Sequence, residues 1–143
     1  MINRPNHGWS SWQFDNFKLP ISYIDDFPFI LLNKIIDFFN TEECQEIEFD
    51  AEGDFYKIFL GFPVYGMVEK EDDDKDNELI ELCDNMVEFT DQLLYDLERD
   101  IKDWAQFPTY AETERDILFI EKEIGQKIID VREAMKKWME RMV

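Results

Sequence analysis

The chain has 143 residues, 45% of them hydrophobic and including thirteen Phe and four Trp, which is enough apolar material for the core of a single domain, 1–143. Its formal net charge of −19 argues against direct binding to nucleic acid or anionic membrane and favours encounter with basic partners. No apolar stretch is long enough to span a bilayer, and none follows a basic start as in a signal peptide, so we expect a cytoplasmic protein.

Residues 1–20 mix aromatic side chains with Asn, Ser, Gly and Pro and show no clean period. This composition predicts irregular structure with a short strand over 12–17, in which Trp9, Trp12 and Phe14 fill the core. The following segment, "SYIDDFPFILLNKIIDFFN", offers Ser22 or Asp25 as a cap and places a proline where a helix can begin. It predicts a helix from about residue 27 to 39.

Between residues 45 and 69 the apolar residues no longer recur with a helical period and instead occupy alternate positions, as in a strand. Ile47 and Phe49 alternate with acidic residues, "AEGD" supplies a turn in which Gly53 can take positive φ, and "FYKIFLGF" continues in β-branched and aromatic residues. This pattern predicts a β-hairpin. Pro63 and Gly66 interrupt the next segment, so a third strand over 64–69 is expected at a sheet edge or with a bulge.

Apolar residues then recur every three or four positions from Glu78 to Trp104, and again after "QFPTYAE" as far as Trp138. Each run predicts a long helix, the second capped by Thr109–Glu112 or by Thr113–Asp116. We therefore predict an α+β fold in which a small antiparallel sheet of two to four strands is packed by one N-terminal helix and a long C-terminal antiparallel helical hairpin.

The sequence offers no recognisable catalytic set. Its one histidine, His7, excludes a zinc site of several histidines and has no nearby carboxylate to orient it as a catalytic base. Cys44 and Cys83 lack CxxC spacing and are expected to be reduced thiols, with Cys83 a small core residue on the apolar side of a helix. The five glycines are scattered and form no phosphate loop. We expect no enzyme, no metal and no cofactor.

The run "EKEDDDKDNE", residues 69–78, holds seven carboxylates and two lysines. Asp72, Asp74 and Asp76 match the first three ligand positions of an EF-hand loop. Asn77 then stands where that loop needs glycine, and Cys83 stands where it needs a bidentate glutamate. Weak counterion binding is therefore expected here in place of a specific calcium site.

The negative charge is localised. Residues 1–110 hold 26 acidic and 8 basic side chains, whereas residues 111–143 hold 8 and 7. In the helix expected from Glu78, acids recur every three or four residues in one row from Glu81 to Asp91, which Glu98 continues one turn beyond Tyr95. Asp96, Asp100 and Asp103 form a second row. Like charges at this spacing repel by a few tenths of a kcal/mol per pair, roughly, so the rows are either a solvated face or an anionic strip for a cationic partner.

Aromatic residues beside these acids could anchor such a partner, and Tyr65, Tyr95 and Tyr110 are the candidates. The residues predicted to bind a partner are Glu71, Asp72, Asp73, Asp74, Asp76, Glu81, Asp84, Glu88, Asp91 and Tyr95.

A small, acidic, cysteine-poor α+β chain with segments such as "SYIDDFPFILLN" and "FDAEGDFYKI" resembles the immunity proteins of bacterial polymorphic and contact-dependent growth inhibition toxin systems. The resemblance implies a stoichiometric inhibitor that covers the active site or substrate surface of a basic cognate toxin, such as a nuclease, without a cofactor. Two alternatives stay open: a nucleic-acid mimic of the anti-restriction or anti-CRISPR type, and an acidic adaptor that uses an apolar groove.

Overall fold

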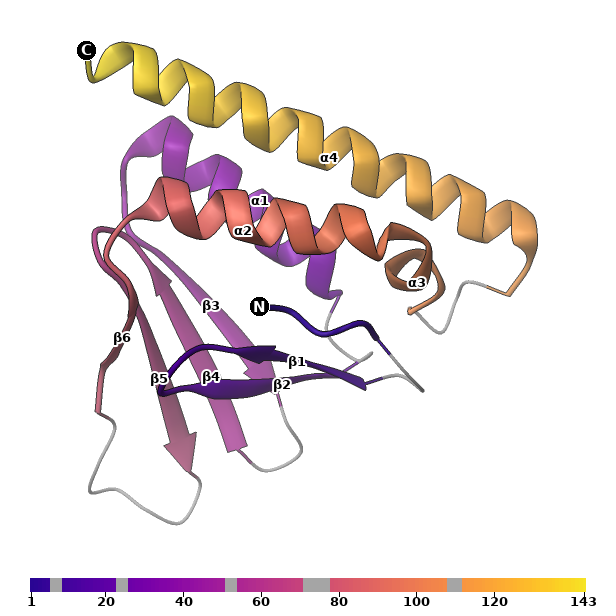
Figure 1. Cartoon of the computed structure of the whole chain (residues 1–143), viewed down its shortest axis with the longest axis horizontal. Coiled ribbons are helices and arrows are strands. Elements are labelled where there is room, and N and C mark those ends of the chain that lie inside the picture. Colours follow the sequence, from indigo (N-terminus) through magenta and orange to yellow (C-terminus); the bar gives the residue numbers. More distant parts are fainter. Residues whose placement is uncertain (6–8, 23–25, 51–53, 71–77, 108–111) are drawn as a thin grey trace.

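The computed structural model describes residues 1–5, 9–22, 26–50, 54–70, 78–107 and 112–143. Within them the chain forms a mixed fold of helices with two antiparallel sheets (Figure 1). In chain order the elements are β1 (Trp9–Gln13), β2 (Lys18–Ser22), α1 (Phe27–Thr41), β3 (Gln45–Asp50), β4 (Asp54–Leu60), β5 (Val64–Lys70), β6 (Ile80–Cys83), α2 (Met86–Arg99), α3 (Ile101–Gln106) and α4 (Glu114–Arg141).

The larger sheet has the strand order β3-β4-β5-β6, and all its neighbours are antiparallel. The hairpin predicted between 45 and 69 is β3 and β4, and its turn residue Gly53 lies outside the described residues. The third strand, β5, was predicted either at a sheet edge or with a bulge. The edge position is wrong, because β6 pairs with β5 on its other side. The other alternative, a bulge, is confirmed by a shift in register between Val64 and Tyr65.

Gly66 shows why β5 carries a glycine. It is buried against the N-terminal hairpin, and a Cβ built on it would lie 3.0 Å from the Phe17 ring and 3.1 Å from a methyl carbon of Leu82. A larger side chain therefore has no free space at this position.

We expect Gly66→Val to lower the free energy of unfolding by about 1–3 kcal/mol, because the new methyl groups would displace Phe17 and Leu82 from their packed positions. Urea unfolding followed by far-UV circular dichroism measures the change. Gly125→Ala is the matched control, since a Cβ there meets nothing within 4 Å and alanine favours the helix by about 0.8–1 kcal/mol over glycine. A Gly66→Val protein as stable as the parent chain would contradict the close approach.

The N-terminal region is more regular than predicted. It forms the hairpin of β1 and β2, with Ile2 bridged to Trp12, in place of irregular structure with one strand over 12–17. Trp12 is buried and packs on Phe27 and Phe89, which confirms it as a core residue, whereas Trp9 is exposed. Trp12, Leu19 and Ile21 are buried, but the half-buried Ser11 and Pro20 and the buried Ser22 beside them obscured the period-two pattern.

The helix predicted over 27–39 is α1, which has a proline in its first turn and ends at Glu42 in the left-handed region, φ 61°. Its N-cap position is Asp26, so the predicted cap at Ser22 is wrong, because Ser22 ends β2. Asp25 lies outside the described residues.

The helix predicted from Glu78 is wrong over its first part. Ile80–Cys83 forms β6, and Cys83 is a half-buried residue at the end of that strand. The helix begins only at Met86, where the Asn85 side chain accepts hydrogen bonds from the Val87 and Glu88 amides, 2.8 and 3.3 Å. Asp100 then separates α2 from α3.

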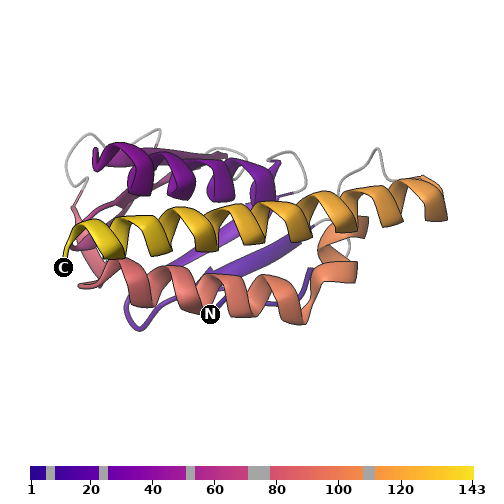
Figure 2. The ribbon, with the colours of Figure 1, turned by 90° about the horizontal axis from the view of Figure 1, so that it is seen from above.

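The second predicted helix is α4, 28 residues long, and the Thr113–Asp116 alternative for its cap is confirmed as a reciprocal capping box. Figure 2 shows α4 between α1 and α2, and its contacts are mainly with α1 and α3. The predicted hairpin of two long helices is therefore not observed. The helices form a layer instead, in which α4 packs mainly on α1 and α3. None of the helices in the described part of the chain combines the length and apolar composition of a membrane span.

Candidate protein-interaction surface

Five of the ten residues predicted to bind a partner lie in the part of the chain that the structure describes. Glu71, Asp72, Asp73, Asp74 and Asp76 lie outside the described residues. The others follow one another from the sheet onto α2: Glu81 on β6, Asp84 in the turn that follows, and Glu88, Asp91 and Tyr95 on α2. All of these are exposed, and Tyr95 retains 62% of its accessible surface. The four carboxylates are called the acidic row below.

Among the side chains that the structure describes, no cation balances the acidic row. Within the described ranges, no Lys or Arg nitrogen lies within 4.0 Å of any of its carboxylates. Asp84 and Glu88 flank the N-terminus of α2, whose dipole favours negative charge, so the helix itself partly offsets their repulsion. Asp91 lies beyond that first turn and receives less of this stabilisation. The row therefore presents its charge to the solvent.

The other acids near α2 have partners, which corrects the prediction of a second charged row. Asp96 is buried, 1% exposed, and accepts hydrogen bonds from the Ile2 amide at 2.9 Å and the Gln92 side chain at 3.1 Å. Arg99 lies 3.5 Å from Asp96 and donates to the Ile2 carbonyl at 3.1 Å. This network ties the start of the chain to α2 and is structural.

Asp100 and Asp103 belong to the same attachment. The Arg99 guanidinium pairs with Asp100 at 2.8 Å, and this hydrogen bond raises the pKa of Arg99 above its usual range. Arg4 pairs with Asp103 at 3.0 Å. The sequence did contain a signal for the burial of Asp96, though not for its partners, because Asp96 is three residues after Leu93 and directly before Leu97 on the apolar side of the helix.

Glu98, one turn beyond Tyr95, forms an ion pair with Arg132 of α4. Glu98 therefore does not extend the acidic row, which ends at Asp91 among the described residues and is short. Such a surface can bind a compact basic patch, and an exposed aromatic ring at its end can add apolar contact.

Cys83, Asp84 and Glu88 bring a thiol and two carboxylates within 4.8 Å of one another. The Cys83 thiol donates to the Asn85 carbonyl at 3.2 Å, and the positive end of the α2 dipole disfavours a cation at this place. The group is better explained as a helix start with acidic neighbours than as a metal centre.

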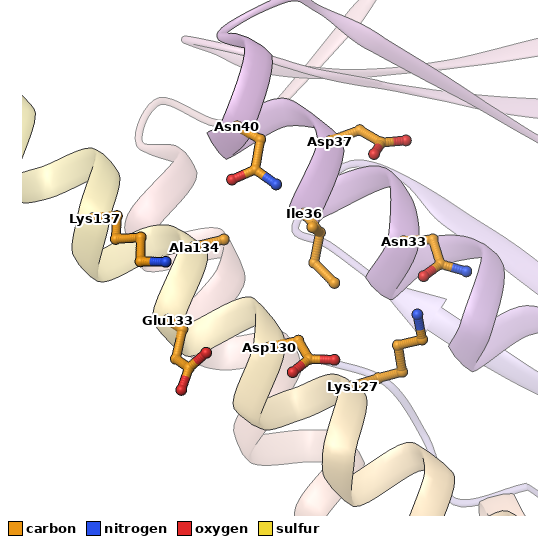
Figure 3. Close-up of a pocket in the computed structure, with 9 residues that line it drawn as sticks. All are labelled: Asn33, Ile36, Asp37, Asn40, Lys127, Asp130, Glu133, Ala134 and Lys137. Carbon is orange, nitrogen blue, oxygen red and sulfur yellow. The ribbon is translucent and has the colours of Figure 1, made fainter.

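A groove of about 570 Å³ lies between α1 and α4 (Figure 3). Its polar lining residues are Asn33, Asp37 and Asn40 from α1 and Lys127, Asp130, Glu133 and Lys137 from α4. Three carboxylates and two ammonium groups line it, and Gln126 donates to Asp130 at 3.0 Å. No single charge dominates the groove, and it contains no cysteine or histidine to act as a nucleophile or base.

No protein-family model, curated protein or solved structure matches the chain. The surfaces of the chain itself therefore carry the evidence for its function, and among the described residues the acidic row is one with uncompensated charge.

Proposed function

We propose that the chain is a non-catalytic binding protein of the immunity type, which neutralises a basic cognate toxin in the cytoplasm by covering its active site or substrate surface. The observation that carries the proposal is the division of the acids around α2. Asp96, Asp100 and Asp103 have basic or backbone partners within the chain, whereas the acidic row has none among the described residues.

The chemistry of a nuclease matches such a surface. A nuclease holds phosphates with Lys and Arg, so an inhibitor gains both association rate and specificity from clustered carboxylates. The Tyr95 ring next to Asp91 supplies an aromatic contact that slows dissociation. The run of acids over 71–76 would add to the field that steers the encounter.

The short acidic row favours a protein partner over mimicry of nucleic acid. Duplex DNA presents one phosphate charge about every 1.7 Å of its axis, so a mimic needs carboxylates over a long surface. Among the described residues the acidic row ends at Asp91, since Glu98, the next acid on that side of α2, is paired with Arg132.

The experiment is a capture from lysate of the source cell with the full chain as bait, washed at low salt and at about 0.5 M salt. We expect one basic protein, retained through the high-salt wash in near-equal amount. Its cleavage of plasmid DNA or of total RNA should fall to background at one equivalent of the chain.

The alternatives give different results in the same experiment. Many nucleic-acid-binding proteins released together at high salt would indicate a mimic and contradict the proposal. A retained protein whose activities the chain leaves unchanged would indicate an adaptor and would also contradict it.

A further inference from the structure

The larger sheet has a second face, which we call the outer face, and its residues follow from the strand register. Three rows of directly paired residues cross it: Glu46, Phe59, Tyr65 and Glu81; Glu48, Lys57 and Met67; and Asp50, Phe55 and Glu69. Each of these residues alternates along its strand with one that points to the core, such as Ile47, Ile58 or Val64.

The described helices and the N-terminal hairpin cover the opposite face. The Phe27 ring of α1 lies 5.7 Å from that of Phe49, and the Phe17 ring lies 6.2 Å from that of Tyr56. Both Phe49 and Tyr56 alternate with outer-face residues. In the described part of the chain, the outer-face side chains of β4 and β5 neither belong to the core nor pack against it.

The centre of the outer face is unusually apolar for a sheet surface in water. Where one side of an antiparallel sheet faces solvent, its side chains are normally polar. Here the two central strands direct Phe55, Phe59, Tyr65 and Met67 outward, and each of them is partly exposed. Aromatic residues also favour strands intrinsically, but methionine is not among the residues that strands favour, so strand propensity does not explain Met67.

The rim of the outer face is acidic. Glu46, Glu48 and Asp50 line its β3 edge, and Glu69 and Glu81 lie on β5 and β6. One cation stands among them: the Lys57 ammonium is 3.3 Å from both Glu46 and Glu69. The hydrogen bonds of Lys57 to Glu46 and to Glu69 raise its pKa, so the two carboxylates stabilise the charged ammonium. Among the described side chains of the outer face, five carboxylates thus surround an apolar centre, and Lys57 is the one cation.

We infer that the outer face is a docking site for a basic protein segment in which apolar side chains are flanked by Arg or Lys. The apolar residues of the segment would cover Phe59, Tyr65 and Met67, and its cations would meet the acidic rim and compete with Lys57 for Glu46 and Glu69. Nucleic acid is repelled by this rim. A second copy of the chain would bring two acidic rims together and is disfavoured for the same reason.

The outer face and the acidic row meet at Glu81, which pairs with Tyr65 in the sheet and precedes Asp84 and Glu88. Four strands about 4.8 Å apart and three rows about 6.8 Å apart span only about 14 by 14 Å. A stable interface covers about 800 Å² per partner, so the outer face is large enough for the centre of one but not for all of it. The identity of the natural partner rests on the proposed function. The chemistry of docking rests only on the residues of the outer face.

The test uses two seven-residue peptides, acetylated and amidated, that carry the same charge: Arg-Leu-Arg-Phe-Arg-Leu-Arg and Arg-Ser-Arg-Ser-Arg-Ser-Arg. Each is titrated into the isotope-labelled full chain at low salt and followed by heteronuclear NMR. We expect the apolar peptide to bind about tenfold tighter and to shift the amides of β4 and β5 most. The double variant Phe59→Ser/Tyr65→Ser should lose this difference, while the matched variant Leu118→Ser/Phe119→Ser, which removes two exposed apolar residues of α4, should keep it.

A second variant keeps the inference testable if the double variant fails to fold. Lys57→Met frees Glu46 and Glu69, so we expect it to bind the apolar peptide about fivefold tighter. Equal affinities of the two peptides, shifts centred on α2 or on the α1–α4 groove, or a dimer abolished by Phe59→Ser/Tyr65→Ser would each overturn the inference. None of these results depends on a toxin, so failure here and failure of the lysate capture are separate.

Discussion

Asp96→Ala is expected to lower the free energy of unfolding by about 2–4 kcal/mol. The substitution removes the acceptor of the Ile2 amide and of the Gln92 side chain, and it leaves Arg99 without its buried carboxylate. Arg99 is partly exposed and can be solvated again, which keeps the loss below that of a fully buried pair. Urea unfolding followed by tryptophan fluorescence measures the change.

Asp91→Ala provides the control on the same helix. Asp91 is exposed and has no ion-pair partner among the described residues, so its removal should change stability by no more than about 0.5 kcal/mol. Asp96→Asn retains an acceptor for the Ile2 amide, so its loss in the free energy of unfolding should lie between those of Asp91→Ala and Asp96→Ala. Equal losses for Asp91→Ala and Asp96→Ala would show that the acids of α2 do not divide into structural and solvent-facing sets.

The role of Asp96 illustrates what sequence reasoning misses. Its partner at the backbone of Ile2 is 94 positions away, and no local pattern identifies that pairing. Features that depend on neighbouring residues were predicted correctly. The segment with alternating apolar residues forms β3 and β4, and the Thr113 capping box begins α4. The strand β6 was missed because its apolar residues fit helical spacing up to Met86, and only pairing with β5 decides its conformation.

The outer face of the sheet was hidden for a related reason. In "FYKIFL" both sets of alternate positions are largely apolar, so the pattern alone cannot say which side faces the core. The register resolves this, because Ile58 and Leu60 share a face with Ile47 and leave Phe55 and Phe59 on the other. The acidic row was predicted from charge spacing, whereas its separation from the paired acids required the positions of Arg4, Arg99 and Arg132.

Reversing two charges of the acidic row, with Glu88→Lys/Asp91→Lys, is expected to weaken binding of the captured basic partner by about 100-fold, or about 2.7 kcal/mol. Each substitution removes an attraction and adds a repulsion. The association rate constant should fall most at low salt, because screening at about 0.1 M already limits exposed charges to about 10 Å. Surface plasmon resonance across a salt series measures both rate constants.

Two comparisons make this result specific to the acidic row. Glu123→Lys/Glu140→Lys changes the net charge of the chain by the same amount on exposed positions of α4, and it should alter affinity by no more than about threefold. Tyr95→Ala should instead raise the dissociation rate constant, because it removes apolar contact and leaves the charge unchanged. If the α4 reversal weakened binding as much as the α2 reversal, only the total charge would matter, and the acidic row would have no special part in binding the partner.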